Sequence, residues 1–156
     1  MQRQTSSSQK KVTNKSRRCP KRFTSFDVSC ILVNMKTVLV VDDSRIMRNI
    51  VKNYFSEQKI PCQYVEAEDG VDALEQLMKN PIDLILLDWN MPKLSGIDFL
   101  KKVRASAKYA NLPIIMVTSE SAKYNVIEAL KLGASDYIIK PINGKLFAEK
   151  ISKIVL

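Results

Sequence analysis

From residue 35 to the C-terminus, short continuous apolar runs alternate with longer segments in which apolar residues recur every three or four positions. The continuous runs are rich in β-branched residues, which is typical of strands buried on both faces of a parallel sheet. Strands are therefore predicted at 37–41, 63–67, 84–87, 114–117 and 137–139.

The segments that follow these runs have the apolar spacing of amphipathic helices. We expect each apolar stripe to pack into a core rather than to bind a partner. Gly133 is predicted to end the fourth helix, because glycine is favoured just beyond a helix C-terminus. The five stripes are Ile46, Met47, Ile50, Val51, Tyr54 and Phe55; Leu74, Leu77 and Met78; Ile97, Leu100 and Val103; Val126, Ile127 and Leu130; and Phe147, Ile151 and Ile154.

A strand followed by a helix, five times over, predicts an α/β fold: a (βα)5 unit with a doubly wound, parallel five-stranded sheet. Right-handed crossovers place helices on both faces of such a sheet. Ligands of these open sheets bind beyond the carboxyl ends of the strands. Candidate chemistry is therefore expected at the strand ends.

Residues 1–34 differ in composition from the rest, being rich in Ser, Thr, Gln, Lys and Arg with almost no apolar periodicity. They carry a net charge of +7 out of a total of +9. We predict a basic, disordered N-terminal extension at 1–34 and a single domain at 35–156. Nucleic-acid binding would depend on the extension alone, and we do not expect it. No apolar run approaches the roughly 18 residues that a transmembrane helix needs.

The chain has three cysteines and no histidine. The missing histidine excludes Cys–His nucleophile pairs, Ser–His–Asp triads and zinc fingers of the usual composition. No CxxC motif occurs, and the cysteine number is odd. We therefore expect reduced thiols and a cytoplasmic protein.

Acidic residues follow two of the predicted strands: Asp42 and Asp43 come after the first, and Asp88 comes after the third. If these strands are neighbours, the three carboxylates converge and resist ionising together. A hard cation such as Mg²⁺ would neutralise them. Each acid alone has a simpler interpretation as a turn residue, and either Asp43 or Ser44 could cap the helix that starts at Arg45.

Two further strand ends supply a hydroxyl and an ammonium, from Thr118 and Lys140. A lysine beside three acids and a cation is useful when a second anion arrives, and a phosphoryl group is such an anion. A carboxylate can accept a phosphoryl group as a nucleophile. Asp88, at the centre of the predicted sheet, is the best candidate.

Four segments in this order resemble the signature of the receiver domains of two-component response regulators: 40–44, 86–92, 118–120 and 133–141. The resemblance covers about residues 36–156. It implies the flavodoxin-like and CheY-like strand order 2-1-3-4-5. Within the family, Trp89, Asn90 and Glu120 are similar to the residues of the single-domain chemotaxis regulators of the CheY type, whereas Ser119 departs from their usual alanine.

The resemblance implies that Asp88 is the phosphoacceptor and receives phosphate from the phosphohistidine of a sensor kinase. It also implies that Asp43, Asp88 and the backbone carbonyl of Asn90 bind Mg²⁺ directly, while Asp42 acts through a bound water. In this family the residues at the positions of Asn90 and Glu120 influence how fast the phosphate is lost.

The resemblance further implies that Lys140 and Thr118 contact the phosphoryl group. Tyr137 corresponds to the switch aromatic, which moves inward when Thr118 is drawn toward the phosphate, and the Lys140–Pro141 peptide bond is expected to be cis. The readout surface would lie roughly within 122–154.

The expected function is that of a single-domain response regulator, which is not an enzyme but loses its phosphate slowly by itself. The chain ends with the receiver, so we expect output through a separate partner. The partners would be a CheA-like sensor kinase and a FliM-like flagellar motor switch protein, and a monomer is expected. One alternative is a phosphorelay shuttle that passes phosphate to a histidine phosphotransfer protein. A second is a phosphatase, although such enzymes use a DxD pair where this chain has adjacent acids, Asp42 and Asp43.

Overall fold

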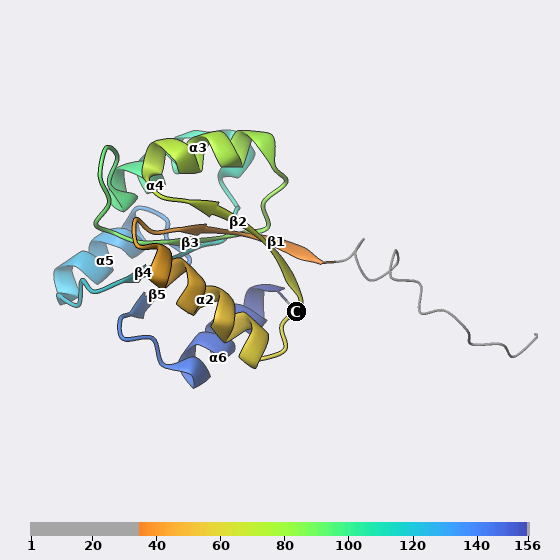
Figure 1. Ribbon diagram of the computed structural model, residues 1–156. Helices are drawn as coiled ribbons and strands as arrows, with labels where there is room; N and C mark the ends of the chain where they lie inside the picture. The colour runs from red at the N-terminus through yellow and green to blue at the C-terminus, as the bar shows by residue number, and fades with distance from the viewer. Residues whose placement is uncertain (1–34, 156) are drawn as a thin grey trace, which may run out of the picture.

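The computed structural model describes residues 35–155, in which a five-stranded parallel sheet lies between two layers of helices (Figure 1). The predicted extension, 1–34, lies outside the described residues. No helix between residues 35 and 155 is long and apolar enough to cross a membrane. The strands are β1 (Lys36–Val41), β2 (Cys62–Ala67), β3 (Leu84–Leu87), β4 (Ile114–Thr118) and β5 (Asp136–Ile139). The helices are α2 (Arg45–Glu57), α3 (Gly70–Lys79), α4 (Gly96–Ala105), α5 (Lys123–Lys131) and α6 (Gly144–Val155), with a 3-10 turn, η1 (Ala107–Tyr109).

The strand order is β2-β1-β3-β4-β5, which confirms the predicted (βα)5 fold and its order. All four pairings are parallel. The central strands β1, β3 and β4 are buried almost completely, as their continuous apolar sequences require.

Alternate residues along the strands point to opposite faces of the sheet and belong to two separate hydrophobic cores. On one face, Leu39 and Val41 pack with residues of α3 and α4, including Phe99. On the other face, Val38 and Val40 pack with residues of α2 and α6, including Phe55 and Phe147. Phe55 and Phe147 are fully buried and meet edge to face, with ring centroids 5.1 Å apart. Figure 1 shows α3 and α4 on one side of the sheet and α2 and α6 on the other.

Three helices begin at side-chain caps in the loops that follow the carboxyl ends of strands. Ser44 caps α2, Asp69 caps α3 and Ser95 caps α4, each by accepting hydrogen bonds from backbone N–H groups of the first turn. The caps define where each loop stops and each helix begins. Gly133, predicted to end the fourth helix, follows Leu132, the C-cap of α5, and has a φ of 102°, at which a residue with a side chain would be strained.

One expectation about the helices was wrong in part. Ile46 and Met78 were expected in the core but are 72% and 70% exposed. In α5 the predicted stripe is largely at the surface, because the helix turns Asn125 and Ala129 inward instead. The apolar residues of α5 that remain exposed are Tyr124, Ile127 and Leu130. Spacing alone could not identify the buried face, because α5 carries apolar residues on more than one side.

Candidate functional site

The register of β1 against β3 places two acids side by side at the carboxyl edge of the sheet. Val41 pairs with Leu87, so that Asp42 and Asp88 each follow a paired residue. The backbone N–H of Asp88 donates to the carbonyl of Val41 at 2.9 Å, which continues the ladder past the last paired residues. Both aspartates are only 6% exposed.

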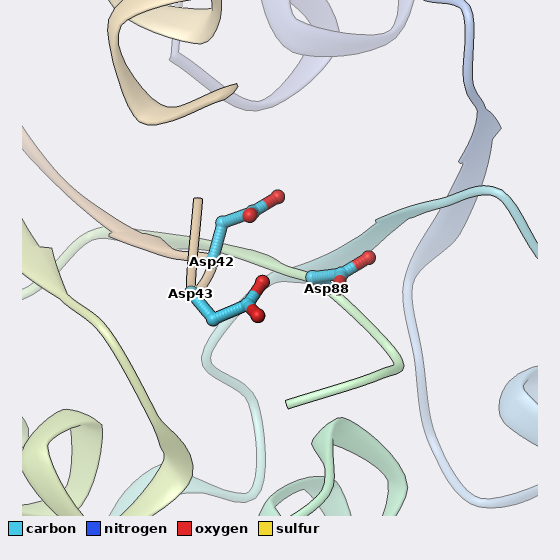
Figure 2. Close-up of side chains that lie close together, drawn as sticks. All are labelled: Asp42, Asp43 and Asp88. Carbon is cyan, nitrogen blue, oxygen red and sulfur yellow. The ribbon is translucent and has the colours of Figure 1, made fainter. Parts of the chain in front are cut away.

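Asp43 completes the acidic group from an exposed position (Figure 2). Because Ser44 caps α2, Asp43 is not used as the cap. One carboxylate oxygen from each of Asp42, Asp43 and Asp88 lies within 4.8 Å of the others. Figure 2 shows the three side chains gathered where β1 and β3 end.

Lys140 reaches this group from the end of β5. Thr118 pairs with Ile139, and the backbone N–H of Lys140 donates to the carbonyl of Thr118 at 2.9 Å. The ammonium lies 2.7 Å from Asp42 Oδ2 and 3.2 Å from Asp88 Oδ1. The peptide bond between Lys140 and Pro141 is cis, as predicted.

The positive charge of Lys140 alone does not neutralise the negative charges of the three acids. Burial, together with the charge of Asp42, raises the pKa of Asp88, and the attraction of Lys140 offsets this only in part. Burial opposes the charge of Lys140 itself, but the hydrogen bond to Asp42 and the charges of both acids raise the pKa of its ammonium overall. The site therefore favours a further cation when Asp88 is ionised.

The donor set fits Mg²⁺. Carboxylate oxygens are the ligands that this hard cation prefers, and it usually needs only a few from the protein because it keeps waters. The exposure of Asp43 leaves an entry path from solvent. Asn90, whose carbonyl was predicted as a ligand, lies two residues beyond Asp88 on an exposed part of the following loop.

Thr118 and Tyr137 lie on the neighbouring strands and meet at Glu120. Thr118 is fully buried, and its Oγ1 accepts a hydrogen bond from the N–H of Glu120 at 3.3 Å. Tyr137 is 7% exposed, with its hydroxyl donating to the carbonyl of Glu120. Burial, with the nearby charges of Glu120 and Asp88, raises the pKa of Tyr137 to about 12, so this hydroxyl keeps its proton and remains a donor.

Glu120 also joins the two sides of the site through its carboxylate. Oε1 accepts from the side-chain amide of Asn90 at 3.2 Å, and Oε2 accepts from that of Asn125 at 2.9 Å. Asn125 is only 8% exposed and lies in α5. Asn125 could not be predicted as a site residue, since an asparagine within a helix usually faces solvent.

The loop from β3 to α4, residues 88–95, folds closely around Asp88. The N–H of Gly96 donates to the carbonyl of Trp89 at 2.9 Å. A Cβ at Gly96 would lie 1.9 Å from the carbonyl oxygen of Asp88, so only glycine fits. Lys93, in this loop, pairs with buried Asp69 at the start of α3. Sequence reasoning missed both partners, although Asp69-Gly70 before an apolar stripe is a helix-cap signal.

Comparison with known proteins agrees with the fold. The sequence matches the response regulator receiver domain over residues 38–152. It is 44% identical to the "Chemotaxis protein CheY homolog" of Campylobacter jejuni over 119 residues, which are 76% of this chain and 91% of the relative. It is equally identical to "Chemotaxis protein CheY1" of Helicobacter pylori, covering 95% of that relative.

Solved structures of response regulators have the same fold as this chain. The chemotaxis response regulator CheY4 of Vibrio cholerae superposes with a TM-score of 0.69 at 33% identity, over 78% of this chain and 99% of the other. A putative response regulator from Chloroflexus aurantiacus gives a TM-score of 0.72 at 26% identity, over 78% and 98%. The fold is therefore a doubly wound parallel sheet with three clustered acids at its carboxyl edge, as its sheet order and acidic group show. This chain belongs to the response regulator receiver domain family.

Proposed function

We propose that the chain receives a phosphoryl group on Asp88 from the phosphohistidine of a sensor kinase, in the presence of Mg²⁺. The observation that supports this most is the position of Asp88, buried within reach of both the other acids and the ammonium of Lys140. Receiver domains act with histidine kinases, and the family assignment supports a kinase as the donor.

In the transfer, a carboxylate oxygen of Asp88 forms a bond to phosphorus while the bond from phosphorus to the histidine nitrogen breaks. The electron pair of that bond stays with the imidazole of the kinase. Asp42, Asp43, Asp88 and the carbonyl of Asn90 would hold Mg²⁺, which supplies charge neutralisation for the incoming phosphoryl oxygens. Lys140, whose ammonium pairs with Asp88, would bind a phosphoryl oxygen, and the hydroxyl of Thr118 would donate a hydrogen bond to another.

This transfer is tested by incubating the protein with Mg²⁺ and acetyl phosphate and measuring the intact mass. One added phosphoryl group is expected for the native chain and none for Asp88→Asn. Asp136→Asn is a matched control, because it removes an acid that pairs with Lys150 away from the site. Labelling of Asp88→Asn at the native rate would show that another residue is the acceptor.

The output that we propose is binding to a flagellar motor switch protein of the FliM type, as a cytoplasmic monomer in chemotaxis. The names of the Campylobacter and Helicobacter relatives support chemotaxis. An apolar strip on α5 and β5 supports a protein partner: Tyr124, Ile127, Leu130 and Ile139 are 72%, 51%, 45% and 44% exposed. Tyr137 lies on β5 two residues before Ile139 of this strip, and its hydroxyl donates to the carbonyl of Glu120, so phosphorylation would be read at the strip through Thr118 and Tyr137.

The second candidate is a phosphorelay shuttle that passes the phosphoryl group to a histidine phosphotransfer protein. Loss of phosphate from the labelled native chain distinguishes the two, because a shuttle benefits from a long-lived aspartyl phosphate. A half-life of hours contradicts the motor assignment, and a short half-life supports it. Ile127→Asp should weaken binding of a motor-switch partner without changing phosphoryl labelling, since the side chain is exposed and outside the acidic group.

A further inference from the structure

The loop that carries Asp88 and Asn90 is fastened to α3 by an ion pair that the phosphoryl chemistry does not require. Lys93 lies in this loop with a φ of 62°, and its ammonium is 2.5 Å from Oδ2 of Asp69. The side chain of Asp69 is only 1% exposed, whereas that of Lys93 is 64% exposed. The loop therefore reaches a buried, fixed acid by means of a long surface side chain.

Asp69 is a rigid anchor because both of its oxygens are used. Oδ1 accepts hydrogen bonds from the N–H groups of Val71 and Asp72, each at 2.8 Å, and so caps α3. Oδ2 is left for Lys93. The hydrogen bond from Lys93 is the largest of several effects that lower the pKa of Asp69, which keeps the carboxylate charged at neutral pH.

The same loop also packs closely against α3 at a second position. A Cβ at Gly70, the first residue of the helix, would lie 2.7 Å from the carbonyl oxygen of Leu94 and 2.8 Å from its Cβ. Gly70 therefore lets the loop backbone approach the helix at the residue next to Lys93. Two adjacent loop residues thus meet two adjacent residues at the N-terminus of α3.

The clasp, defined here as the Lys93–Asp69 ion pair, adjoins the acidic group. A cavity of about 260 Å³ is lined by both clasp residues together with Asp43, Glu68 and Pro92. The loop thus begins at Asp88 and crosses to the side of Asp43 before it enters α4. A loop that is also held by a side-chain ion pair presents its backbone carbonyls in one arrangement. A loop that is attached only through the chain at its two ends samples several arrangements.

We propose that Lys93 is a positioning residue. Its ion pair with Asp69 holds the 88–95 loop so that Asp88 and the Asn90 carbonyl face Asp43. This arrangement strengthens Mg²⁺ binding. This inference rests on the proposed metal site. Residues that orient the ligands of a metal typically alter its affinity about 10- to 100-fold when removed. The physical reason is that only the loop conformers with the ligands in place bind the cation.

The opposite effect is expected if Lys93 acts only as a nearby positive charge. Its ammonium would then repel Mg²⁺, and removing it would tighten binding. The two roles therefore predict changes of opposite sign for the same substitution, Lys93→Met, which keeps the aliphatic stem and removes the charge.

The experiment titrates Mg²⁺ into the full chain and follows the fluorescence of Trp89, the only tryptophan and the residue next to Asp88. Lys93→Met should weaken Mg²⁺ binding about tenfold. Lys102→Met, on the exposed side of α4, should leave it unchanged and serves as the control. Unchanged or tighter binding in Lys93→Met overturns the proposal.

Two further measurements complete the test. Asp69→Asn keeps a capping side chain, and when combined with Lys93→Met it should add no further loss of Mg²⁺ affinity, because one interaction is removed by either change. Independent, additive losses overturn the clasp. Hydrogen exchange without Mg²⁺ should be faster for the amides of 89–95 in Lys93→Met, and unchanged exchange also overturns it. If the native chain binds no Mg²⁺, the metal site fails, whereas the exchange result still decides the clasp.

Discussion

Lys140 Nζ lies 3.2 Å from Oδ1 of Asp88, although the two residues are 52 positions apart in the chain. The contact exists because β5 and β3 end at the same edge of the sheet with β4 between them. The same ammonium is 2.7 Å from Asp42. Without a metal ion, Lys140 is therefore the partner of two buried acids, and it competes with any cation for their oxygens.

The competition predicts the behaviour of Lys140→Met. Without Mg²⁺ the variant should lose about 1–3 kcal/mol of unfolding free energy, because Asp42 and Asp88 remain buried without the hydrogen bonds of their cationic partner. Mg²⁺ should bind several-fold more tightly, because a competing positive charge is gone. Urea unfolding and the Trp89 titration measure the two effects. An unchanged Mg²⁺ affinity would contradict the competition, and Lys102→Met provides the comparison at an exposed position.

Removal of the Asp88 carboxylate should raise the unfolding free energy, whereas removal of the Lys140 ammonium should lower it. The pKa of Asp88 is raised, so the folded state binds a proton more tightly than the unfolded state does, and above that pKa the ionised carboxylate destabilises the fold. Asp88→Asn should therefore increase the unfolding free energy at neutral pH without Mg²⁺, by about 1 kcal/mol.

Mg²⁺ is the internal control for that variant. A saturating concentration should stabilise the native chain more than Asp88→Asn, because the cation binds the complete acidic group more tightly. With saturating Mg²⁺, the difference in unfolding free energy between Asp88→Asn and the native chain should therefore shrink or change sign. A native chain that is more stable than Asp88→Asn at neutral pH without Mg²⁺ would show that Lys140 fully compensates the buried charge.

Much of the fold could be predicted because the strands are continuous apolar runs in an alternating order with helices. The chemical group at the sheet edge could also be placed, since parallel strands bring their carboxyl ends together and each strand ends at a chemically distinctive residue. Asp42, Asp88 and Lys140 lie together as that reasoning requires. The roles assigned to them remain predictions.

The features that sequence could not supply depend on long-range packing. Lys93 has no local sequence signal, since its partner Asp69 lies 24 positions earlier and is reached only when the loop folds back over α3. Asn125 is turned inward by the orientation of α5, which leaves Ile127 at the surface, contrary to expectation. Helix orientation is decided by which residue fits the sheet, and spacing along one helix does not contain that information.

Gly96→Ala should show how closely the loop and helix are fitted around the acid. The new Cβ would lie 1.9 Å from the carbonyl oxygen of Asp88, so the backbone must move at the acidic group itself. We expect a loss of more than about 3 kcal/mol in unfolding free energy and a weakened Mg²⁺ site. Gly144→Ala is the control, because its Cβ would meet only side chains, the ring of Tyr54 at 3.1 Å and Nε2 of Gln58 at 3.8 Å. Native-like stability of Gly96→Ala would contradict the close approach.

The ion pair of Asp69 should appear in the pH dependence of stability. Its pKa is lowered in the folded state, chiefly by Lys93, so its contribution is present above the ordinary aspartate pKa of 3.8 and is lost as the pH falls through the lower, folded value. Asp69→Asn cannot titrate but can still cap α3. The stability difference between the native chain and Asp69→Asn should therefore be largest near neutral pH and should decrease below about pH 4.

The same comparison in the Lys93→Met background separates the ion pair from the helix cap. Without the ammonium, the pH-dependent part of the difference should be smaller, whereas the hydrogen bonds from Val71 and Asp72 still favour the charged carboxylate. Other titrating groups, Asp88 among them, are present in both members of each pair and cancel. Urea unfolding between about pH 2 and pH 7 measures all four chains. An equal pH dependence in both backgrounds would mean that Lys93 does not stabilise the charge of Asp69, and the clasp would then lose its electrostatic basis.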